Sequence, residues 1–143
     1  MSIAKVLLVD DEVNFVETFS ERLELRDFEI SKAFSGQEAL QVLEENKNIE
    51  VVILDVKMPD MDGIETLAEI KRKHPLVEVM MLSGHADVAS AIEGMKQGAF
   101  DYLMKPVDMD RIITKVTEAA AKKRRHEEKI IQARIKEITS RRA

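Results

Sequence analysis

Three short runs of consecutive apolar residues constrain the fold of this chain more than any other feature. They lie at Val6–Val9, Val51–Leu54 and Val79–Leu82. Continuous apolar runs of this length are typical of strands that are buried on both faces of a parallel sheet. Two weaker candidates, Glu29–Ala33 and Asp101–Met104, complete a spacing of about two dozen residues, which is typical of strand plus crossover helix. We therefore expect five strands.

The segments between these strands have the helical period. Apolar residues recur at i, i+3, i+4 and i+7 between residues 88 and 95, and a similar pattern runs from 15 to 23. Ser35 and Glu38 have the spacing of a capping box, and Asp108 is a suitable N-cap for the last helix. Strict alternation with right-handed crossovers predicts an α/β domain, a doubly wound five-stranded parallel sheet with helices on both faces.

The charge is divided unevenly along the 143 residues. The net charge is −5, but nine Lys or Arg and three Glu from Lys122 onward make a local net charge of +6, so the first 121 residues carry −11. An apolar content of 45% suits one self-folding domain. We therefore predict a domain over residues 1–121 and a basic C-terminal helical extension or linker over residues 122–143.

An uninterrupted last helix from Asp108 to Ser140 would extend about 50 Å, so its second half should project or fold back. Three interpretations of this extended C-terminal helix remain open: a solvated linker, a dimerising or partner-binding helix, and a basic nucleic-acid contact. Apolar residues at Ile131, Ile135 and Ile138 suggest the second, but two heptads are too few to place it ahead of the linker. The third is weakly supported, because the basic run has no interleaved aromatic residue.

The sequence contains no pattern of a signal peptide and no apolar stretch near the roughly 20 residues that span a bilayer. We therefore expect a cytoplasmic protein without membrane insertion. The absence of cysteine excludes disulfides and thiolate metal sites.

Polar residues follow four of the five predicted strands. Asp10 and Asp11 come after the first, Asp55 after the third, Ser83 after the fourth and Lys105 after the fifth. Ligand sites in such sheets lie outside the carboxyl ends of the strands, so these side chains should meet. Any single Asp at a strand end is more often a turn residue or a helix cap, but the whole set is hard to explain by capping.

Crowded carboxylates resist ionisation unless a cation is present, and an all-oxygen set suits Mg2+. Mg2+ tends to use one or two carboxylates, which leaves Asp55 for a chemical role. A carboxylate can attack phosphorus and form an aspartyl phosphate. Lys105 and Mg2+ would offset the phosphoryl charge, while the Ser83 hydroxyl could donate a hydrogen bond.

Four motifs resemble the receiver domain of bacterial two-component response regulators over about residues 3–121. They occur in the order and spacing of that family: KVLLVDDE (5–12), VVILDVKMPDMDG (51–63), VMMLSG (79–84) and FDYLMKP (100–106). The resemblance implies a flavodoxin-like sheet of order 2-1-3-4-5 and a phosphorylation-dependent signalling switch.

The resemblance also implies residue roles. Asp55 would take a phosphoryl group from a sensor histidine kinase or phosphotransfer protein. Asp11, Asp55 and the main-chain carbonyl of Lys57 would bind Mg2+, with Asp10 assisting largely through water. The domain would phosphorylate and dephosphorylate itself, rather than work as a conventional turnover enzyme.

Further implied features concern switching. Ser83 would follow the phosphoryl group while Tyr102 changes rotamer, and the Lys105–Pro106 peptide would be cis. Lys57 and His85 would lie at the mouth of the site and tune the phosphoryl lifetime, although His85 fits an ordinary surface histidine equally well. The fourth helix, fifth strand and last helix would form the output face. A homodimer would use this face or the C-terminal helix.

Two other functions are alternatives to a switch. An aspartate-dependent small-molecule phosphohydrolase would also form a phosphoaspartate, but its second acid usually lies two residues from the nucleophile and its cap needs an insertion. A flavodoxin-like cofactor binder fits the architecture. It is disfavoured, because the chain has no Trp, one Tyr and an acidic first loop.

Overall fold

The five predicted strands form one parallel sheet with the order β2-β1-β3-β4-β5. The computed structural model describes residues 2–84 and 88–142. The strands are β1 (Lys5–Val9), β2 (Glu29–Ala33), β3 (Val51–Leu54), β4 (Glu78–Ser83) and β5 (Asp101–Met104). The helices are α1 (Val13–Glu24), α2 (Gly36–Glu45), α3 (Gly63–Lys73), α4 (Val88–Lys96) and α5 (Met109–Arg142). The predicted doubly wound fold, strand order and long C-terminal helix are confirmed.

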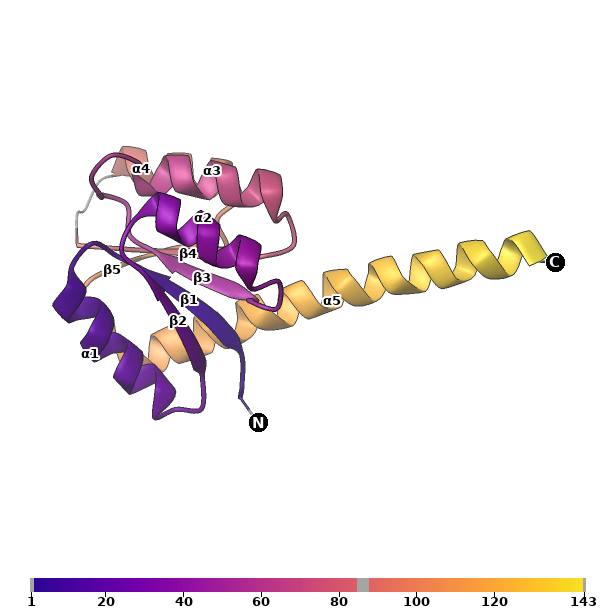
Figure 1. Cartoon of the computed structure of the whole chain (residues 1–143), viewed down its shortest axis with the longest axis horizontal. Helices are drawn as coiled ribbons and strands as arrows, with labels where there is room; N and C mark the ends of the chain where they lie inside the picture. The colour runs from indigo at the N-terminus through magenta and orange to yellow at the C-terminus, as the bar shows by residue number, and fades with distance from the viewer. Residues whose placement is uncertain (1, 85–87, 143) are drawn as a thin grey trace.

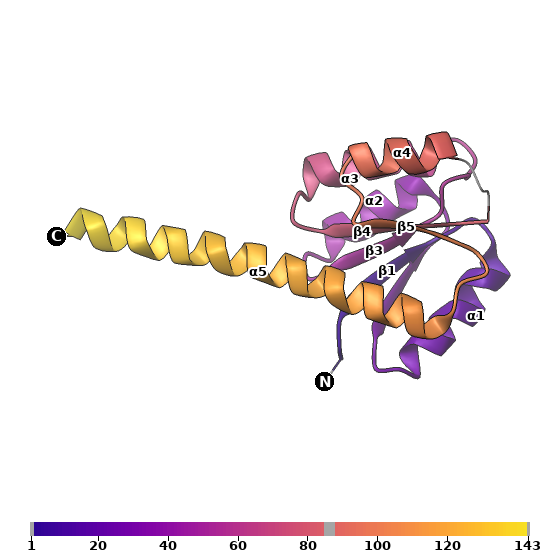
Figure 2. The ribbon, with the colours of Figure 1, turned by 180° about the vertical axis from the view of Figure 1, so that it is seen from behind.

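Helices cover both faces of the sheet. α1 and α5 lie on one face, and α2, α3 and α4 lie on the other (Figures 1 and 2). Successive strand residues point to opposite faces. Leu8 and Ile53 therefore join the core beneath α1 and α5, while Leu7 and Val52 join the core beneath α2 and α3. The central strands are continuously apolar because both of their faces are buried.

Side chains cap the N-terminal ends of α2, α3 and α5. The Ser35 hydroxyl accepts a hydrogen bond from the Glu38 N–H at 3.1 Å, as the capping pattern predicts. Asp108 accepts one from the Asp110 N–H at 3.4 Å, just before α5. At α3, Asp62 accepts a hydrogen bond from the Glu65 N–H at 2.9 Å, a cap that no pattern in the sequence had indicated.

α5 runs from the sheet into solvent as one helix. Its apolar stripe is fully buried at Ile112 and Val116, whereas Ile131, Ile135 and Ile138 are about half exposed. The second half therefore projects from the body and does not fold back (Figures 1 and 2). No helix in the described residues combines the length and apolar character that crossing a membrane requires.

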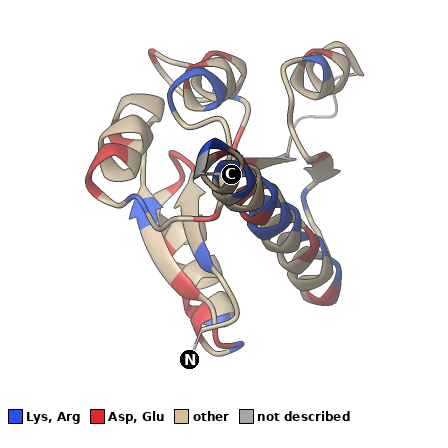
Figure 3. Ribbon diagram, turned by 90° about the vertical axis from the view of Figure 1, so that its right-hand side faces the viewer, with Lys and Arg blue, Asp and Glu red and all other residues tan. Residues whose placement is uncertain are grey.

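The start of the basic run is attached to the body. Arg124 donates hydrogen bonds to Glu50 at 2.6 and 2.8 Å and to the Ile3 carbonyl at 2.9 Å. Lys122 lies 3.4 Å from Glu78, and Lys123 is buried. Basic residues then continue along the projecting part of α5 (Figure 3). The boundary predicted at residue 121 therefore falls within a continuous helix, and the division into domain and extension stays a prediction.

Candidate functional site

The strand register brings the predicted site residues to one edge of the sheet. Val9 and Leu54 are partners on β1 and β3, so Asp10 and Asp55 emerge side by side. The Asp55 N–H donates to the Val9 carbonyl at 3.0 Å. On the other side of β3, β4 and β5 run in parallel, and the Lys105 N–H donates to the carbonyl of Ser83 at 2.8 Å. The carboxyl ends of four adjacent strands therefore form the site.

Three carboxylates gather at this edge. Asp10, Asp11 and Asp55 each offer an oxygen, and these oxygens lie within 4.8 Å of one another. Asp10 and Asp55 are buried, whereas Asp11 is exposed. Within residues 2–84 and 88–142, no other group of three acidic or histidine side chains is close enough to hold a metal ion. An all-oxygen donor set with one solvent-facing member fits a hard divalent cation that retains water ligands.

The environment of Asp55 makes its ionised form less favourable than that of an ordinary aspartate. One carboxylate oxygen accepts a hydrogen bond from the Val56 N–H at 2.9 Å. Burial and the negative charge of Asp10 raise the pKa of Asp55 from 3.8 to about 6, against the opposing influence of Lys105 and the Val56 N–H. Asp55 is therefore mostly ionised at neutral pH, as the sequence analysis assumed, but at a cost in repulsion.

Lys105 is the cation that approaches the carboxylates most closely. Its Nζ lies 2.6 Å from Asp10 Oδ2 and 3.8 Å from the exposed carboxylate of Glu12. The other Asp10 oxygen accepts the Glu12 N–H at 3.0 Å. Both oxygens of Asp10 are therefore engaged by protein donors, which suits a supporting position next to a metal. The Lys105–Pro106 peptide is cis.

Gly63 brings the start of α3 against the strand that carries Asp55. A Cβ at Gly63 would lie 2.1 Å from the Asp55 carbonyl oxygen and 2.7 Å from Val56 Cα. The Gly63 N–H also donates to the Val56 carbonyl at 2.6 Å. Only glycine permits this approach, so Gly63 positions the backbone next to the candidate phosphoacceptor. The Asp-Gly pair signals a turn in sequence, but it does not reveal this contact.

The remaining predicted residues occupy different settings. Ser83 is fully buried at the end of β4. Tyr102 is half-buried on β5, with ring atom Cδ2 3.9 Å from where a Cβ at Gly94 of α4 would lie. Lys57 is exposed in the loop after β3. The switching roles of Ser83 and Tyr102 and the metal contact of the Lys57 carbonyl stay predictions. His85 lies outside the described residues.

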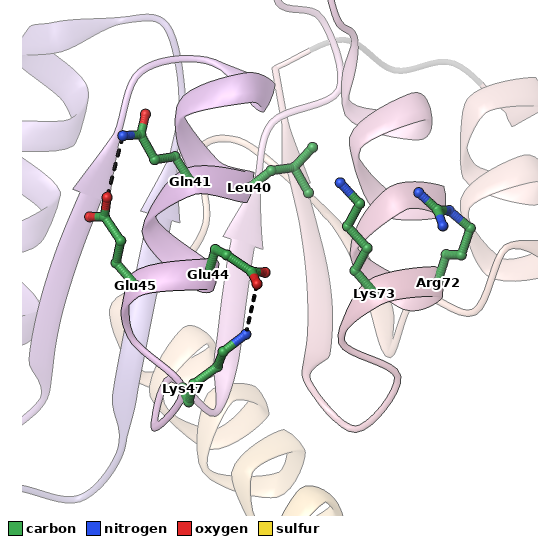
Figure 4. A pocket seen from close by; sticks show the side chains of 7 residues that line it. All are labelled: Leu40, Gln41, Glu44, Glu45, Lys47, Arg72 and Lys73. Atoms are coloured by element: carbon green, nitrogen blue, oxygen red, sulfur yellow. Dashed lines mark hydrogen bonds and ion pairs between the residues drawn. The ribbon is translucent and has the colours of Figure 1, made fainter.

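A surface hollow lies between α2 and α3, away from these carboxylates (Figure 4). It has a volume of about 590 Å³ and is lined by Leu40, Gln41, Glu44, Glu45, Lys47, Arg72 and Lys73. Crossover helices run antiparallel to the strands, so the ends of α2 and α3 that line it belong to the opposite edge of the sheet. Within its lining, Glu44 pairs with Lys47 at 3.3 Å, whereas Arg72 and Lys73 pair with Glu69 outside the lining.

Comparison with known proteins agrees with the motifs. Residues 6–117 match the family model described as the response regulator receiver domain. The transcriptional regulatory protein ZraR of Klebsiella oxytoca is 35% identical over 127 residues, which are 89% of this chain and 28% of ZraR. The regulatory protein AtoC of Escherichia coli K12 is 36% identical over 111 residues, 78% of this chain and 24% of AtoC. The chain thus spans about a quarter of the length of these relatives.

Solved structures show the same architecture. A response regulator receiver domain protein from Clostridium thermocellum is 37% identical, with a TM-score of 0.76 over 89% of this chain and 98% of that one. NtrX from Brucella abortus is 32% identical, with a TM-score of 0.82 over 90% of this chain and 29% of NtrX. The matches do not support the phosphohydrolase alternative. The chain belongs to the response regulator receiver domain family, whose members act as phosphorylation-dependent switches in two-component signalling.

Proposed function

We propose that Asp55 is the phosphoacceptor of this domain and receives its phosphoryl group from a phosphohistidine on a sensor histidine kinase or phosphotransfer protein. The observation that carries the proposal is the cluster of Asp10, Asp11 and Asp55, whose oxygens lie within 4.8 Å of one another beside Lys105. Three carboxylates and one lysine make this cluster net negative, whereas buried Glu78 elsewhere in the protein is paired with lysines.

The chemistry requires an ionised, oriented carboxylate. One Asp55 oxygen is held by the Val56 N–H, so the other is available to attack phosphorus. A P–O bond to Asp55 forms as the P–N bond to the donor imidazole breaks, and the bonding electron pair returns to the ring nitrogen. The pKa of about 6 leaves most Asp55 ionised at pH 7, so no separate base is needed.

The neighbouring residues offset the charge of the phosphoryl group. Asp10, Asp11, Asp55 and the carbonyl of Lys57 would hold Mg2+, with Asp10 acting largely through water. Bound Mg2+ supplies positive charge for the carboxylates and phosphoryl oxygens. Lys105 supplies the second cation, and the buried Ser83 hydroxyl donates a hydrogen bond to a phosphoryl oxygen.

The output surface lies on α4, β5 and α5. α4 exposes the apolar residues that give it its helical period, with Val88 at 76% and Ile92 at 52%, and Met104 of β5 is 48% exposed. Tyr102 lies between β5 and α4 and couples this surface to the site. A partner protein or a second copy of the chain would cover this surface in the cell cytoplasm, and the exposed isoleucines of α5 offer an alternative dimer contact.

Incubation with Mg2+ and acetyl phosphate, followed by mass spectrometry, tests this function directly. We expect one added phosphoryl group on Asp55, lost on chelation of Mg2+ and in Asp55→Asn. The matched control is Asp60→Asn, because Asp60 is exposed in the same loop and its φ of 67° suits asparagine. Phosphorylation that persists in Asp55→Asn, or that disappears equally in Asp60→Asn, would contradict the assignment.

A further inference from the structure

The ammonium group of Lys105 lies between two carboxylates and an aromatic ring. Asp10 is 2.6 Å away and Glu12 is 3.8 Å away. Nζ also lies over the ring of Phe15, 4.0 Å from the ring centroid. The Lys105 side chain is only 16% exposed, whereas that of Glu12 is 70% exposed, so water screens the Glu12 contact more strongly. Asp10 and Phe15 are therefore the principal contacts.

Packing of α1 holds the Phe15 ring in place. Phe15 stacks on Phe19, one helical turn later, with ring centroids 5.0 Å apart and planes inclined by 18°. Phe19 is 7% exposed and belongs to the core cluster beneath α1 and α5. The ring under Lys105 is thus fixed to the hydrophobic core and not to a mobile surface side chain.

We propose that Phe15 is a positioning residue, which orients the Lys105 ammonium toward the phosphoryl group through a cation–π contact. The inference rests on the proposed role of Lys105. An aromatic face attracts an ammonium without carrying a net charge. Phe15 can therefore hold Lys105 near the site without adding a further carboxylate, which would repel the phosphoryl group and compete with it for the lysine.

The contact with Phe15 also differs from the contact with Asp10 in its dependence on the metal. Asp10 is a candidate metal-site residue, so its charge is shared between the lysine and any bound cation. The ring has no such second ligand. Phe15 is consequently the contact that limits the directions available to Lys105 in both the metal-free and the metal-bound protein.

Proton NMR of the lysine ε-methylene groups tests the contact directly. A ring current shifts protons over an aromatic face upfield, so we expect the Lys105 signal, assigned with Lys105→Arg, upfield of the other lysine signals. Phe15→Leu should return it to the ordinary position, whereas Phe15→Tyr should retain the shift. The control is Phe100→Leu, the same change at a partly buried ring of the same core, 5.7 Å from Lys122.

The functional consequence can be followed through Tyr102, the only tyrosine in the chain. Loss of a cation–π contact changes an equilibrium constant by a factor of about 2 to 30. In protein phosphorylated by acetyl phosphate, we expect Phe15→Leu to lower the ratio of switched to unswitched Tyr102 ring signals about three- to ten-fold. Phe15→Tyr should restore the ratio, and Phe100→Leu should leave it unchanged.

The outcomes separate this inference from the proposed function. Absence of Asp55 phosphorylation in the unmodified protein would refute the proposed function. Normal phosphorylation with an ordinary Lys105 ε-methylene shift in the unmodified protein would overturn the role of Phe15, whether or not Phe15→Leu folds. An unchanged Tyr102 ratio in folded Phe15→Leu would overturn it as well.

Discussion

The two ends of the parallel sheet differ in how far cations balance the charge of their carboxylates. At the carboxyl end, Asp10, Asp11 and Asp55 converge beside Lys105, which is bonded to Asp10. Burial and the charge of Asp10 raise the pKa of Asp55 to about 6. The carboxylates at this end therefore repel one another, and binding of an external cation would relieve that repulsion.

At the amino end, cations match the carboxylates. Glu78, which is 3% exposed at the start of β4, lies 3.7 Å from Lys71 and 3.4 Å from Lys122. Glu50 accepts two hydrogen bonds from Arg124. Carboxylates therefore stabilise the fold at the end where cations balance them, and they can bind a ligand at the end where negative charge is in excess. The position of the cations, and not the presence of acids, distinguishes a structural end from a functional one.

Glu78→Gln should have the largest effect on stability. It leaves two lysines next to a neutral group in a buried setting, and the free energy of unfolding should fall by about 2–3 kcal/mol. That figure is below the range for fully buried pairs because Lys122 is 39% exposed. Urea unfolding measures it, with exposed Glu118→Gln on α5 as a control expected within about 0.5 kcal/mol of the unmodified protein. If Glu78→Gln left the free energy of unfolding unchanged, pairing at the amino end would not stabilise the fold, and the two ends would not differ in this respect.

Asp55→Asn should stabilise the metal-free protein, in contrast to Glu78→Gln. In metal-free protein at pH 8, loss of the Asp55 charge relieves repulsion and should raise the free energy of unfolding by about 1–2 kcal/mol. Urea unfolding with a chelator present gives the value. If Asp55→Asn instead lowered the free energy of unfolding, neighbouring positive charge would already balance the Asp55 carboxylate in the folded domain.

The titration of Asp55 should also make the free energy of unfolding depend on pH. Its folded pKa of about 6 lies above its ordinary 3.8, so folding favours the protonated carboxyl. The contribution is complete below about pH 4 and is lost as the pH rises through 6. The two pKa values alone would give about 3 kcal/mol, and solvent screening at the open edge of the sheet lowers our expectation to about 1–2 kcal/mol. The difference in unfolding free energy between the unmodified protein and Asp55→Asn, measured without metal from pH 4 to 8, should show this step. A constant difference would contradict it.

Mg2+ should stabilise the folded protein by binding only at the carboxyl end of the sheet. At about ten times its Kd, a ligand that binds only the folded state adds about 1.4 kcal/mol. Thermal unfolding should show this increment in the unmodified protein and a smaller one in Asp11→Asn. Glu50→Gln, at the other end, should start from a lower stability but keep the full increment.

Arg124→Ala should have the smallest effect. Its side chain is 54% exposed, so water screens its pair with Glu50, and we expect a loss of about 0.5–1 kcal/mol that shrinks in high salt. A loss larger than that of Glu78→Gln would mean that anchoring of α5 outweighs burial of charge at this end.

Local patterns in the sequence predicted much of the fold and most of the site. The apolar runs that form β1, β3 and β4 carry Asp10, Asp55 and Ser83 directly after them, and parallel pairing then brings these residues to one edge. α4 was less informative, because its apolar period predicts a helix but its side chains stay exposed. Periodicity reports which residues share a face, and it does not report whether another element covers that face.

The sequence by itself determined the order of strands and helices and the polar residues that end each strand, because these follow from local periodicity and from the parity of side chains along a strand. Only the tertiary structure decided that Phe15 lies under Lys105, that Gly63 touches the Asp55 backbone and that Lys122 meets Glu78. Such contacts depend on how helices of given length and tilt pack on a twisted sheet. That packing is a property of the whole core and not of any local pattern.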